Sequence, residues 1–524
     1  MDQAQGHRYG KCAAEGADQI TKFGLVVFGL LNVWLYAALL PLWDGFDEPF
    51  HYGYVQHLSH HGSLPVSGQT MMPVELCESL RLTSAGVVAQ RNLKFPLTHE
   101  QYLQLPVSER QARRTALRDL PPAPSPGDCF VNYEAQQAPL AYAILAVPDR
   151  LLDPLALPDR ILILRGICGS IAVLLLLAGL SILSTELKLS PAVYTAAAFA
   201  TLSVQMIYAT TAHITNDFLA APLFTLIVAT SLRYYRTATM RDGLIAALTL
   251  AAALATKAYF LAVLPVFAIM VARHGRRQAA VLLGAAILPG SWWYLRNIQL
   301  YGSLSGMNEV SAGAGLAPVL RSFLQIDWPA SLAYMLRGAL WTGNNSFTAF
   351  SQTTLSILLV LTALGIALFL RRRLGNNLMA AYLAAFTLAL VYSAGVNYVQ
   401  TNGHSQGASP WYILPLVPVL FLMSTRGLGA AAAPFLLLNA YIINATYVVK
   451  LIPQYGGFTG PRATLPALWN WYTADPAAIT ANLRDLSLGP PILIVPLTGL
   501  VLVSSIALCL IALRRTPQPP PPGS

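Results

Sequence analysis

Residues 23–51 read FGLVVFGLLNVWLYAALLPLWDGFDEPFH, an apolar run that ends abruptly in a polar and acidic segment. A run of roughly 18 or more apolar residues is long enough to span a bilayer, so we expect Phe23–Leu42 to be a membrane-spanning helix. The run is too long for the core of a signal peptide, and no small-residue cleavage site follows it. The mature protein is therefore expected to retain it. The acids of Trp43–His51 then lie at one membrane surface.

The rest of the chain repeats this alternation of apolar runs and polar connections. Hydrophobic residues make up 55% of the 524 residues and charged residues 11%, whereas a typical soluble domain has about 25% charged residues. We therefore predict an all-α polytopic membrane protein with about twelve spanning helices. The predicted spans are residues 23–42, 161–184, 192–210, 214–232, 243–256, 258–272, 278–295, 351–370, 376–396, 411–425, 427–448 and 491–513.

Basic residues in the short loops predict the orientation of these spans, because such residues collect on the cytoplasmic side. With the N-terminus in the cytoplasm, every short basic loop falls on that side: Lys188, Arg233/Arg236/Arg241, Arg273/Arg276/Arg277, Arg371–Arg373, Arg426 and Arg514/Arg515. The other side receives the long loops 43–160, 296–350, 397–410 and 449–490. We expect a bacterial-type inner membrane, with the active site on the periplasmic or extracellular side. Membrane topology explains the net charge of +10, so we expect no nucleic-acid partner.

The predicted spans and loops divide the chain into four segments. Residues 1–22 form a cytoplasmic tail, and residues 23–300 form a catalytic transmembrane half that includes the large outer loop 43–160. Residues 301–513 form a C-terminal transmembrane half with further outer loops. The remainder, 514–524, is rich in proline and is expected to be a disordered cytoplasmic tail.

Two of the five cysteines, Cys77 and Cys129, share the large outer loop. If that loop faces an oxidising compartment, these two residues can form a disulfide; two free thiols are the alternative. No pair of cysteines in the chain has the spacing of a zinc site.

The first group with a potential for chemistry is Asp47, Glu48 and His51, directly after the first span. Adjacent carboxylates beside a membrane are costly unless they are solvated or used. Pro49 favours the start of a helix, which would place both acids at the positive end of the helix dipole. A general base is one use of such a pair. The alternative is a helix cap combined with charges that only set topology.

A metal site is a second hypothesis for the same segment. His57, His60 and His61 are spaced so that His57 shares a helix face with the other two. Asp47, Glu48 or His51 could complete a site for a divalent cation. A solvated interfacial helix explains the same spacing, and we favour that explanation over the metal site.

Further polar candidates are all predicted at the outer boundary of a span. They include two acids and two amides, which are Glu134, Gln137, Asn216 and Asp217. Ordinary turn chemistry explains Asn216 and Asp217 equally well. Lys257 lies between two apolar runs, where it can hold a lipid-linked phosphate as a point charge or simply extend to the interface. The remaining candidates for substrate binding are Arg296, His404, Gln406 and the aromatic pair Trp411-Tyr412. Their hydrogen-bonding groups and aromatic faces suit a sugar, but they also suit any interfacial loop.

The distribution of these groups separates classes of membrane protein. An ion-coupled transporter is expected to carry ionisable groups near the middle of the membrane, whereas here they gather at one face. The sequence contains no Walker motif and no glycine-rich phosphate loop, which removes support for ATP-driven transport. We therefore expect an interfacial active site that faces outward. A transporter or flippase of a lipid-linked sugar and a non-catalytic membrane scaffold remain as alternatives.

In their order and sidedness, these motifs resemble the GT-C class of polyprenyl-phosphate-dependent glycosyltransferases. The resemblance is greatest to family 39-type enzymes, which include the bacterial lipid A aminoarabinose transferases and the protein O-mannosyltransferases. It covers about residues 23–300, and the second half resembles the class in topology alone. The stretches that carry it are Phe46–Pro49, Gly62–Pro65, Tyr133-Glu134 with Pro139-Leu140, Thr215–Asp217 and Thr256-Lys257.

The resemblance implies a GT-C fold and the transfer of a monosaccharide from a polyprenyl-phosphate donor by an inverting single displacement. It implies that Asp47 is the base, that Glu48, Glu134 and Asp217 organise the site, and that Lys257 holds the phosphate. A lipid, a glycan or a protein is the acceptor, and membrane lipids surround the chain. A divalent metal is the one cofactor candidate and stays open. A relative that transfers an oligosaccharide from a diphosphate donor is a closer alternative.

Two features of the sequence depart from the aminoarabinose transferases. The first outer loop carries a long insertion, about residues 66–130, that is rich in arginine and proline. Glu134 is followed by Ala135-Gln136-Gln137 instead of Lys-Pro. Both departures leave the acceptor and the subfamily open.

Overall fold

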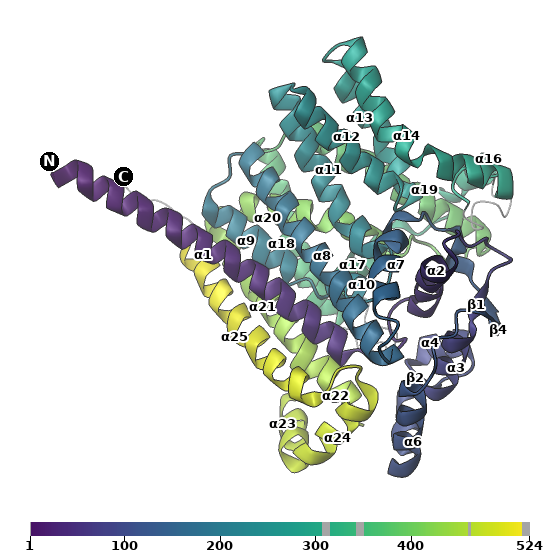
Figure 1. Cartoon of the computed structure of the whole chain (residues 1–524). Helices are drawn as coiled ribbons and strands as arrows, with labels where there is room; N and C mark the ends of the chain where they lie inside the picture. Colours follow the sequence, from purple (N-terminus) through teal and green to yellow (C-terminus); the bar gives the residue numbers. More distant parts are fainter. Residues whose placement is uncertain (1, 307–314, 342–349, 460–462, 516–524) are drawn as a thin grey trace.

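The computed structural model describes residues 2–306, 315–341, 350–459 and 463–515, and these residues are predominantly helical (Figure 1). The predicted all-α fold is therefore confirmed. The strands found in the described residues are four short ones in the first outer loop: β1 (Met71–Pro73), β2 (Ser84–Ala85), β3 (Leu97–Thr98) and β4 (Pro126–Val131). β1 pairs with β4 in antiparallel orientation, and β2 pairs with β3 in parallel orientation.

Along the chain the helices form two groups, those that begin before residue 301 and those that begin after it. Those of the N-terminal half are α1 (Asp2–Leu39), α2 (Glu48–His61), α3 (Val74–Leu82), α4 (Val87–Leu93), α5 (His99–Gln104), α6 (Val107–Arg118), η1 (Tyr133–Gln136), α7 (Leu140–Leu151), α8 (Leu157–Glu186), α9 (Pro191–Leu202), α10 (Gln205–Thr211), α11 (Asp217–Thr237), α12 (Met240–Leu254), η2 (Ala258–Val263), α13 (Leu264–Ala272) and α14 (Arg276–Tyr301). Those of the C-terminal half are α16 (Leu316–Ser322), α17 (Trp328–Leu340), α18 (Gln352–Arg371), α19 (Asn377–Gln400), η3 (Pro410–Leu416), α20 (Val417–Leu428), η4 (Gly429–Ala432), α21 (Ala433–Ala445), η5 (Thr446–Leu451), α22 (Ile452–Tyr455), α23 (Leu465–Ala474), α24 (Pro476–Leu486) and α25 (Pro491–Arg515).

Seven helical segments of the described residues are long and apolar enough to cross a membrane, which makes the chain a multi-pass membrane protein. The bent pair α9 and α10, with a 58° angle between them, brings the number to eight if it forms one span. The predicted number of about twelve is not confirmed. The difference has three sources. The predicted span 278–295 lies in α14, which is not among the segments that are long and apolar enough. Met240–Leu254 and Ala258–Ala272 are short, and the 46-residue segment Pro410–Tyr455 covers two predicted spans. The chain is interrupted within that segment at Gly429, where φ is +53°.

Both ends of the chain differ in part from the predicted tails. Helix α1 begins at Asp2, so it includes nearly all of the residues predicted as an N-terminal cytoplasmic tail. At the other end, α25 continues to Arg515. The rest of the predicted disordered tail, residues 516–524, lies outside the described residues.

Small residues in α8 allow the helices behind the site to pack closely. A Cβ atom at Gly166 would lie 2.3 Å from the ring of Trp34 in α1, and one at Gly169 would lie 2.6 Å from Val33. On another face of α8, a Cβ atom at Gly179 would lie 3.0 Å from Thr225 in α11. Such close approach is a common basis of helix packing in membranes, where apolar surface alone gives no net attraction. α1, α8 and α11 therefore form a close-packed base for the loops above them.

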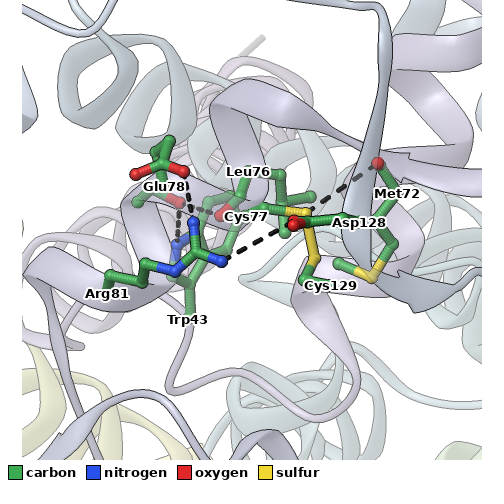
Figure 2. Close-up of a disulfide and its surroundings, with 9 residues drawn as sticks. Trp43, Met72, Leu76, Cys77, Glu78, Arg81, Asp128 and Cys129 are labelled. Atoms are coloured by element: carbon green, nitrogen blue, oxygen red, sulfur yellow. Dashed lines mark hydrogen bonds and ion pairs between the residues drawn. A yellow bond between two sulfur atoms is a disulfide. The ribbon is translucent and has the colours of Figure 1, made fainter.

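The first outer loop is a folded layer held together by a disulfide. Cys77 in α3 and Cys129 in β4 form this bond across 52 residues of sequence. Figure 2 shows it beside Arg81, which pairs with Glu78 and, at 3.6 Å, with Asp128. Disulfides persist in oxidising compartments, so this bond is compatible with the predicted outward-facing loop.

The loops predicted to be on the outer side contact one another. In the first loop, Arg110 and Arg114 of α6 pair with Asp485 of α24 at 2.8 and 3.0 Å. The backbone N–H of Ser67 donates to the hydroxyl of Tyr301, at the end of α14 (3.0 Å). The predicted orientation requires these loops to share one side of the membrane, and their contacts agree with it.

Candidate functional site

The motifs that sequence analysis singled out converge on one pocket, which we call the polar pocket. It has an empty volume of about 690 Å³ and lies where the end of α1, the start of α2, η1, the turn before α11, the α12–η2 break and η3 meet. Its lining residues are Phe46, Asp47, His51, Tyr133, Glu134, Gln136, Gln137, Thr210, His213, Thr215, Asn216, Asp217, Lys257, Ser409, Trp411 and Tyr412.

Asp47 is the exposed carboxylate of the polar pocket. It precedes α2 with φ +54° and ψ 15°, a left-handed conformation that costs energy for a residue other than glycine. Its backbone carbonyl accepts the N–H groups of Phe50 and His51 at 3.0 and 3.1 Å, which fixes the turn. Its carboxylate has no hydrogen bond or ion pair with any residue that the structure describes. Backbone strain of this kind clusters at functional sites. Here the strained turn places the unpaired carboxylate of Asp47 at the wall of the polar pocket.

Glu48, the neighbouring acid, is buried behind the pocket and does not line it. Its carboxylate accepts from Arg165 of α8, with Nε to Oε1 at 2.7 Å and Nη2 to Oε2 at 2.5 Å. Its Oε1 also accepts the backbone N–H of Ile214 at 3.1 Å. Arg165 in addition donates to the carbonyl groups of Leu40 and Pro41, at the end of the first span. The pair therefore ties together the first span, α2, α8 and the turn before α11.

Glu134, in η1, is a buried acid whose environment favours its protonated form. Burial, and then the negative charge of Asp47, raise the pKa of Glu134 to about 8. Its Oε2 lies 3.7 Å from Nδ1 of His51, and that nitrogen shares a 2.8 Å hydrogen bond with the hydroxyl of Tyr142. Burial lowers the pKa of His51 well below its usual value. At neutral pH both groups are therefore uncharged, and Glu134 can donate a hydrogen bond.

Lys257 is the cation of the polar pocket, and it is held in place by Asp217. Its Nζ lies 2.5 Å from Oδ1 of Asp217, the first residue of α11, and both side chains are mostly buried. The ring of Tyr412 lies 5.3 Å from the same ammonium group. Nearby, the side chain of Asn216 donates to Oε1 of Gln137 at 3.2 Å. Lys257 follows the end of α12, so the predicted break in that hairpin is present and presents the lysine to the pocket.

A second cavity, which we call the apolar groove, opens beside Lys257. It has an empty volume of about 1150 Å³ and shares Lys257, Gln137 and Tyr412 with the polar pocket. The other residues that line it come mainly from η2 and α19: Ala258, Tyr259, Leu261, Ala262, Ser305, Phe386, Ala389, Leu390, Tyr392, Ser393, Val396 and Asn397. Lys257 is the only one of these residues that carries a charge, and it stands where apolar and polar surroundings meet.

Three of the predicted substrate-binding residues do not line the polar pocket. Arg296 donates to the carbonyl of Pro65 at 2.9 Å and lies over the ring of Trp293. Gln406 accepts the backbone N–H of Asp327 at 3.0 Å, and His404 is likewise absent from the lining. Arg296 and Gln406 instead make contacts between loop segments.

The predicted aromatic pair Trp411-Tyr412 lines the polar pocket. His213, Thr210 and Ser409 also line it, but they were not among the predicted site residues. His213 shares a 3.1 Å hydrogen bond with the carbonyl of Phe46, and a Cβ atom at Gly45 would lie 2.7 Å from its ring. His213 adjoins the Asn216-Asp217 motif, so its motif was visible in the sequence. Thr210 and Ser409 belong to no recognisable motif, because single hydroxyl residues at the ends of spans are common.

The candidate metal ligands, which are His57, His60 and His61 with Asp47, Glu48 or His51, do not form one ligand set in the described structure. Glu48 is occupied by Arg165, and His51 Nδ1 by Tyr142. Across the described parts of the chain, no three His, Cys, Asp or Glu side chains gather as metal ligands. We therefore assign no step to a metal.

Comparisons with known proteins give distant structural likeness alone. No family model matches the chain, and no curated protein matches it. Solved structures that resemble it include the Archaeoglobus fulgidus oligosaccharyltransferase tethered to an acceptor peptide, and the archaeal oligosaccharyltransferase AglB from the same organism with an inhibitory peptide and a dolichol-phosphate. Each match has 12% identity and a TM-score of 0.37, and covers 90% of this chain but 56% of the other. At this similarity, the residues of the pocket must carry any inference of function.

Proposed function

We propose that the protein is a membrane glycosyltransferase of the GT-C class that takes a monosaccharide from a polyprenyl-phosphate donor at the outer face of the membrane. The observation that carries this proposal is the position of Lys257, which lines both the apolar groove and the polar pocket. A lipid-linked sugar has the same three parts in the same order: an apolar chain, an anionic phosphate and a polar sugar.

The donor binds with its polyprenyl chain in the apolar groove and its phosphate at Lys257. The groove is lined by aromatic and aliphatic side chains of η2 and α19, among them Tyr259, Phe386 and Leu390. Among the residues that the structure describes, Lys257 is the only cation that lines either cavity, so it is the natural partner of an anion there. The sugar then extends into the polar pocket, where the side chains of Gln137 and Asn216 offer hydrogen bonds.

Transfer proceeds by a single displacement that inverts the anomeric carbon. Asp47 accepts the proton of the acceptor hydroxyl or amine while that atom attacks the anomeric carbon. The bond between this carbon and the phosphate oxygen breaks, and its electron pair leaves with the phosphate. Lys257 stabilises the negative charge that develops there. Glu134, protonated at neutral pH, donates a hydrogen bond to the sugar.

Asp47 is the base in this proposal because each of the other acids is either paired with a cation or protonated. Glu48 is paired with Arg165 and Asp217 with Lys257, while burial keeps Glu134 protonated. Asp47 alone among these four is exposed and unpaired in the described structure. A lipid, a glycan or a protein can supply the acceptor group.

The experiment that tests the proposal measures sugar transfer in membranes containing the protein or its Asp47→Asn variant. Radiolabelled polyprenyl-phosphate sugars serve as donors, and both labelled product and released lipid phosphate are counted. Loss of a general base is expected to lower the rate by about 10²–10⁴-fold, without loss of donor binding. Asp128→Asn is the matched control, because Asp128 is 87% exposed in the same loop.

Equal turnover by wild type and Asp47→Asn would remove Asp47 from the mechanism. Transbilayer movement of the same lipids in liposomes, without any release of lipid phosphate, would instead favour a flippase. Both outcomes contradict the proposal in different ways, so the two readouts belong in one experiment.

A further inference from the structure

A third cavity, which we call the aromatic pocket, meets the polar pocket at Asp47. The two share Asp47 and Tyr133, whereas Lys257 lines only the polar pocket and the apolar groove. The aromatic pocket has an empty volume of about 920 Å³. Its other lining residues come from the turn into α2, from α4 and from β4: Trp43, Gly45, Pro49, Phe50, Ala89, Leu93, Phe130 and Val131. Asp47 is thus reached from two directions, one of which holds the donor in the proposed function.

The charge of the described side chains of the aromatic pocket disfavours an anionic ligand. Asp47 is the only charged residue that lines it among the side chains that the structure describes. A phosphate or carboxylate group on the ligand would face this carboxylate with no described cation to offset the repulsion. A neutral ligand with hydroxyl groups, by contrast, can donate a hydrogen bond to Asp47.

Aromatic rings shape the pocket and remain partly open to solvent. The ring of Phe50 lies 4.3 Å from that of Tyr133 and 5.8 Å from that of Phe130, measured between centroids. Tyr133 is 37% exposed and Val131 is 42% exposed. Apolar surface exposed outside the membrane beside a polar group marks a binding site. Its ligand should combine C–H faces, which pack on aromatic rings, with hydroxyl groups.

We propose that the aromatic pocket is the acceptor site and that it takes a neutral carbohydrate. This inference rests on the proposed function, since it assigns the acceptor of the same reaction. A pyranose ring packs its C–H face on Phe130 or Tyr133 and directs one hydroxyl group toward Asp47. The hydroxyl oxygen bonds to the anomeric carbon of the donor, its proton passes to Asp47, and the phosphate leaves toward Lys257.

One wall of the pocket lies in the part of the loop that departs from the aminoarabinose transferases. Ala89, Leu93 and Phe130 all fall within the insertion 66–130, and the Cys77–Cys129 disulfide holds the residue before Phe130 to α3. The insertion therefore has a structural role in acceptor choice in this proposal.

Saturation-transfer NMR on the full-length protein in lipid nanodiscs tests the carbohydrate assignment. The probes are neutral tetrasaccharides of glucose, mannose and galactose, a tetrasaccharide of galacturonic acid, and an apolar hexapeptide that contains threonine. We expect transfer to at least one neutral tetrasaccharide, and none to the acidic one or to the peptide. Phe130→Ala is expected to weaken binding by about tenfold or more.

Two further variants separate binding from folding. Val131→Trp adds bulk at a partly exposed position and should abolish carbohydrate binding without loss of the thermal transition. Trp469→Ala is the matched control, since Trp469 is 70% exposed on α23 and lines none of the three cavities. Carbohydrate binding that survives in both Phe130→Ala and Val131→Trp would overturn the assignment, as would preference for the hexapeptide or silence from every neutral tetrasaccharide.

The donor side is measured separately, by the thermal shift that a long-chain polyprenyl phosphate produces in wild type and in Lys257→Gln. A Lys257-dependent shift without carbohydrate binding would overturn the acceptor assignment and leave the proposed donor standing. Carbohydrate binding without any such shift would support the aromatic pocket as a carbohydrate-binding site and contradict the proposed function. The two failures are therefore distinguishable.

Discussion

Glu134 is a carboxylic acid that its surroundings keep protonated. Its pKa is raised from 4.5 to about 8, first by burial and then by the charge of Asp47. The stability that its neutral form contributes is fully present below about pH 4.5, and is lost as pH rises through about 8. Above that pH an ionised Glu134 would repel Asp47 and could no longer donate a hydrogen bond to the sugar.

We therefore predict that transfer by the wild-type protein falls by about tenfold or more as pH rises through 8, and that Glu134→Gln lacks this alkaline decline. Glutamine keeps the hydrogen-bond donor but cannot ionise. The measurement is the pH profile of sugar transfer, with thermal unfolding recorded at the same pH values. A profile unchanged by the substitution would contradict the role given to Glu134.

Lys257 and Asp217 form a pair in which each compensates the charge of the other. Lys257→Gln is expected to weaken binding of polyprenyl phosphate by about tenfold to a hundredfold, because the one cation of the two cavities is lost. The unpaired Asp217 would also destabilise the protein. The double variant Lys257→Gln/Asp217→Asn removes that penalty, so it should regain stability without regaining affinity. Recovery of affinity in the double variant would show that Lys257 only neutralises Asp217.

At the scale of secondary structure, substitutions in α19 can test binding of the lipid chain separately from binding of the phosphate. Ala389 lines the apolar groove, whereas its neighbour Leu388 is 67% exposed on the outside of the same helix. We predict that Ala389→Trp weakens binding of a long-chain polyprenyl phosphate by about tenfold and leaves binding of a short-chain prenyl phosphate nearly unchanged.

The control for this prediction is Leu388→Trp, which adds the same bulk outside the groove. Thermal shift titrations with both lipids supply the measurement. Equal loss of affinity for long and short chains in Ala389→Trp would place the lipid chain elsewhere.

The sequence predicted elements better than it predicted contacts between them. Asp47, Glu134, Asp217 and Lys257 belong to short motifs at span ends, and alternating spans were enough to place them on one side. However, two residues on the same side of the membrane need not be close to each other. Arg296 was therefore predicted in the site, although it does not line the polar pocket. The Glu48–Arg165 pair joins residues 117 apart in sequence, and no local pattern marks such a partner.

The predicted number of spans is not confirmed, for a related reason. Hydropathy measures how apolar a segment is, but not where its helix bends or stops. The short helix Ala258–Ala272 after Lys257 and the 58° bend between α9 and α10 are such features, and average hydropathy over a window does not register them.

At the scale of the whole molecule, Asp485 joins the two halves on the outer side. Its side chain is 3% exposed and pairs with Arg110 and Arg114 of the first loop. Removing one partner of a buried pair leaves uncompensated charge and costs about 3–5 kcal/mol. We predict that Asp485→Asn lowers the thermal transition and exposes the first loop to protease.

Glu109→Gln is the control for Asp485→Asn. Glu109 also pairs with an arginine of α6, but its side chain is 44% exposed, and exposed pairs contribute about 0–1 kcal/mol. Equal protease sensitivity in both variants would mean that the contact between the halves does not depend on this buried pair.

The two buried arginines of α8 also bear on the order of events during synthesis. Arg160 pairs with Glu75, and Arg165 with Glu48, and both acids precede α8 in the chain. A ribosome therefore delivers each acid, and the loop that carries it, before the arginine that needs it. A segment with two arginines is costly to leave in lipid alone, but the counter-ions of these two are already synthesised when α8 follows. The first outer loop thus acts as a built-in assembly partner for the helix that follows it.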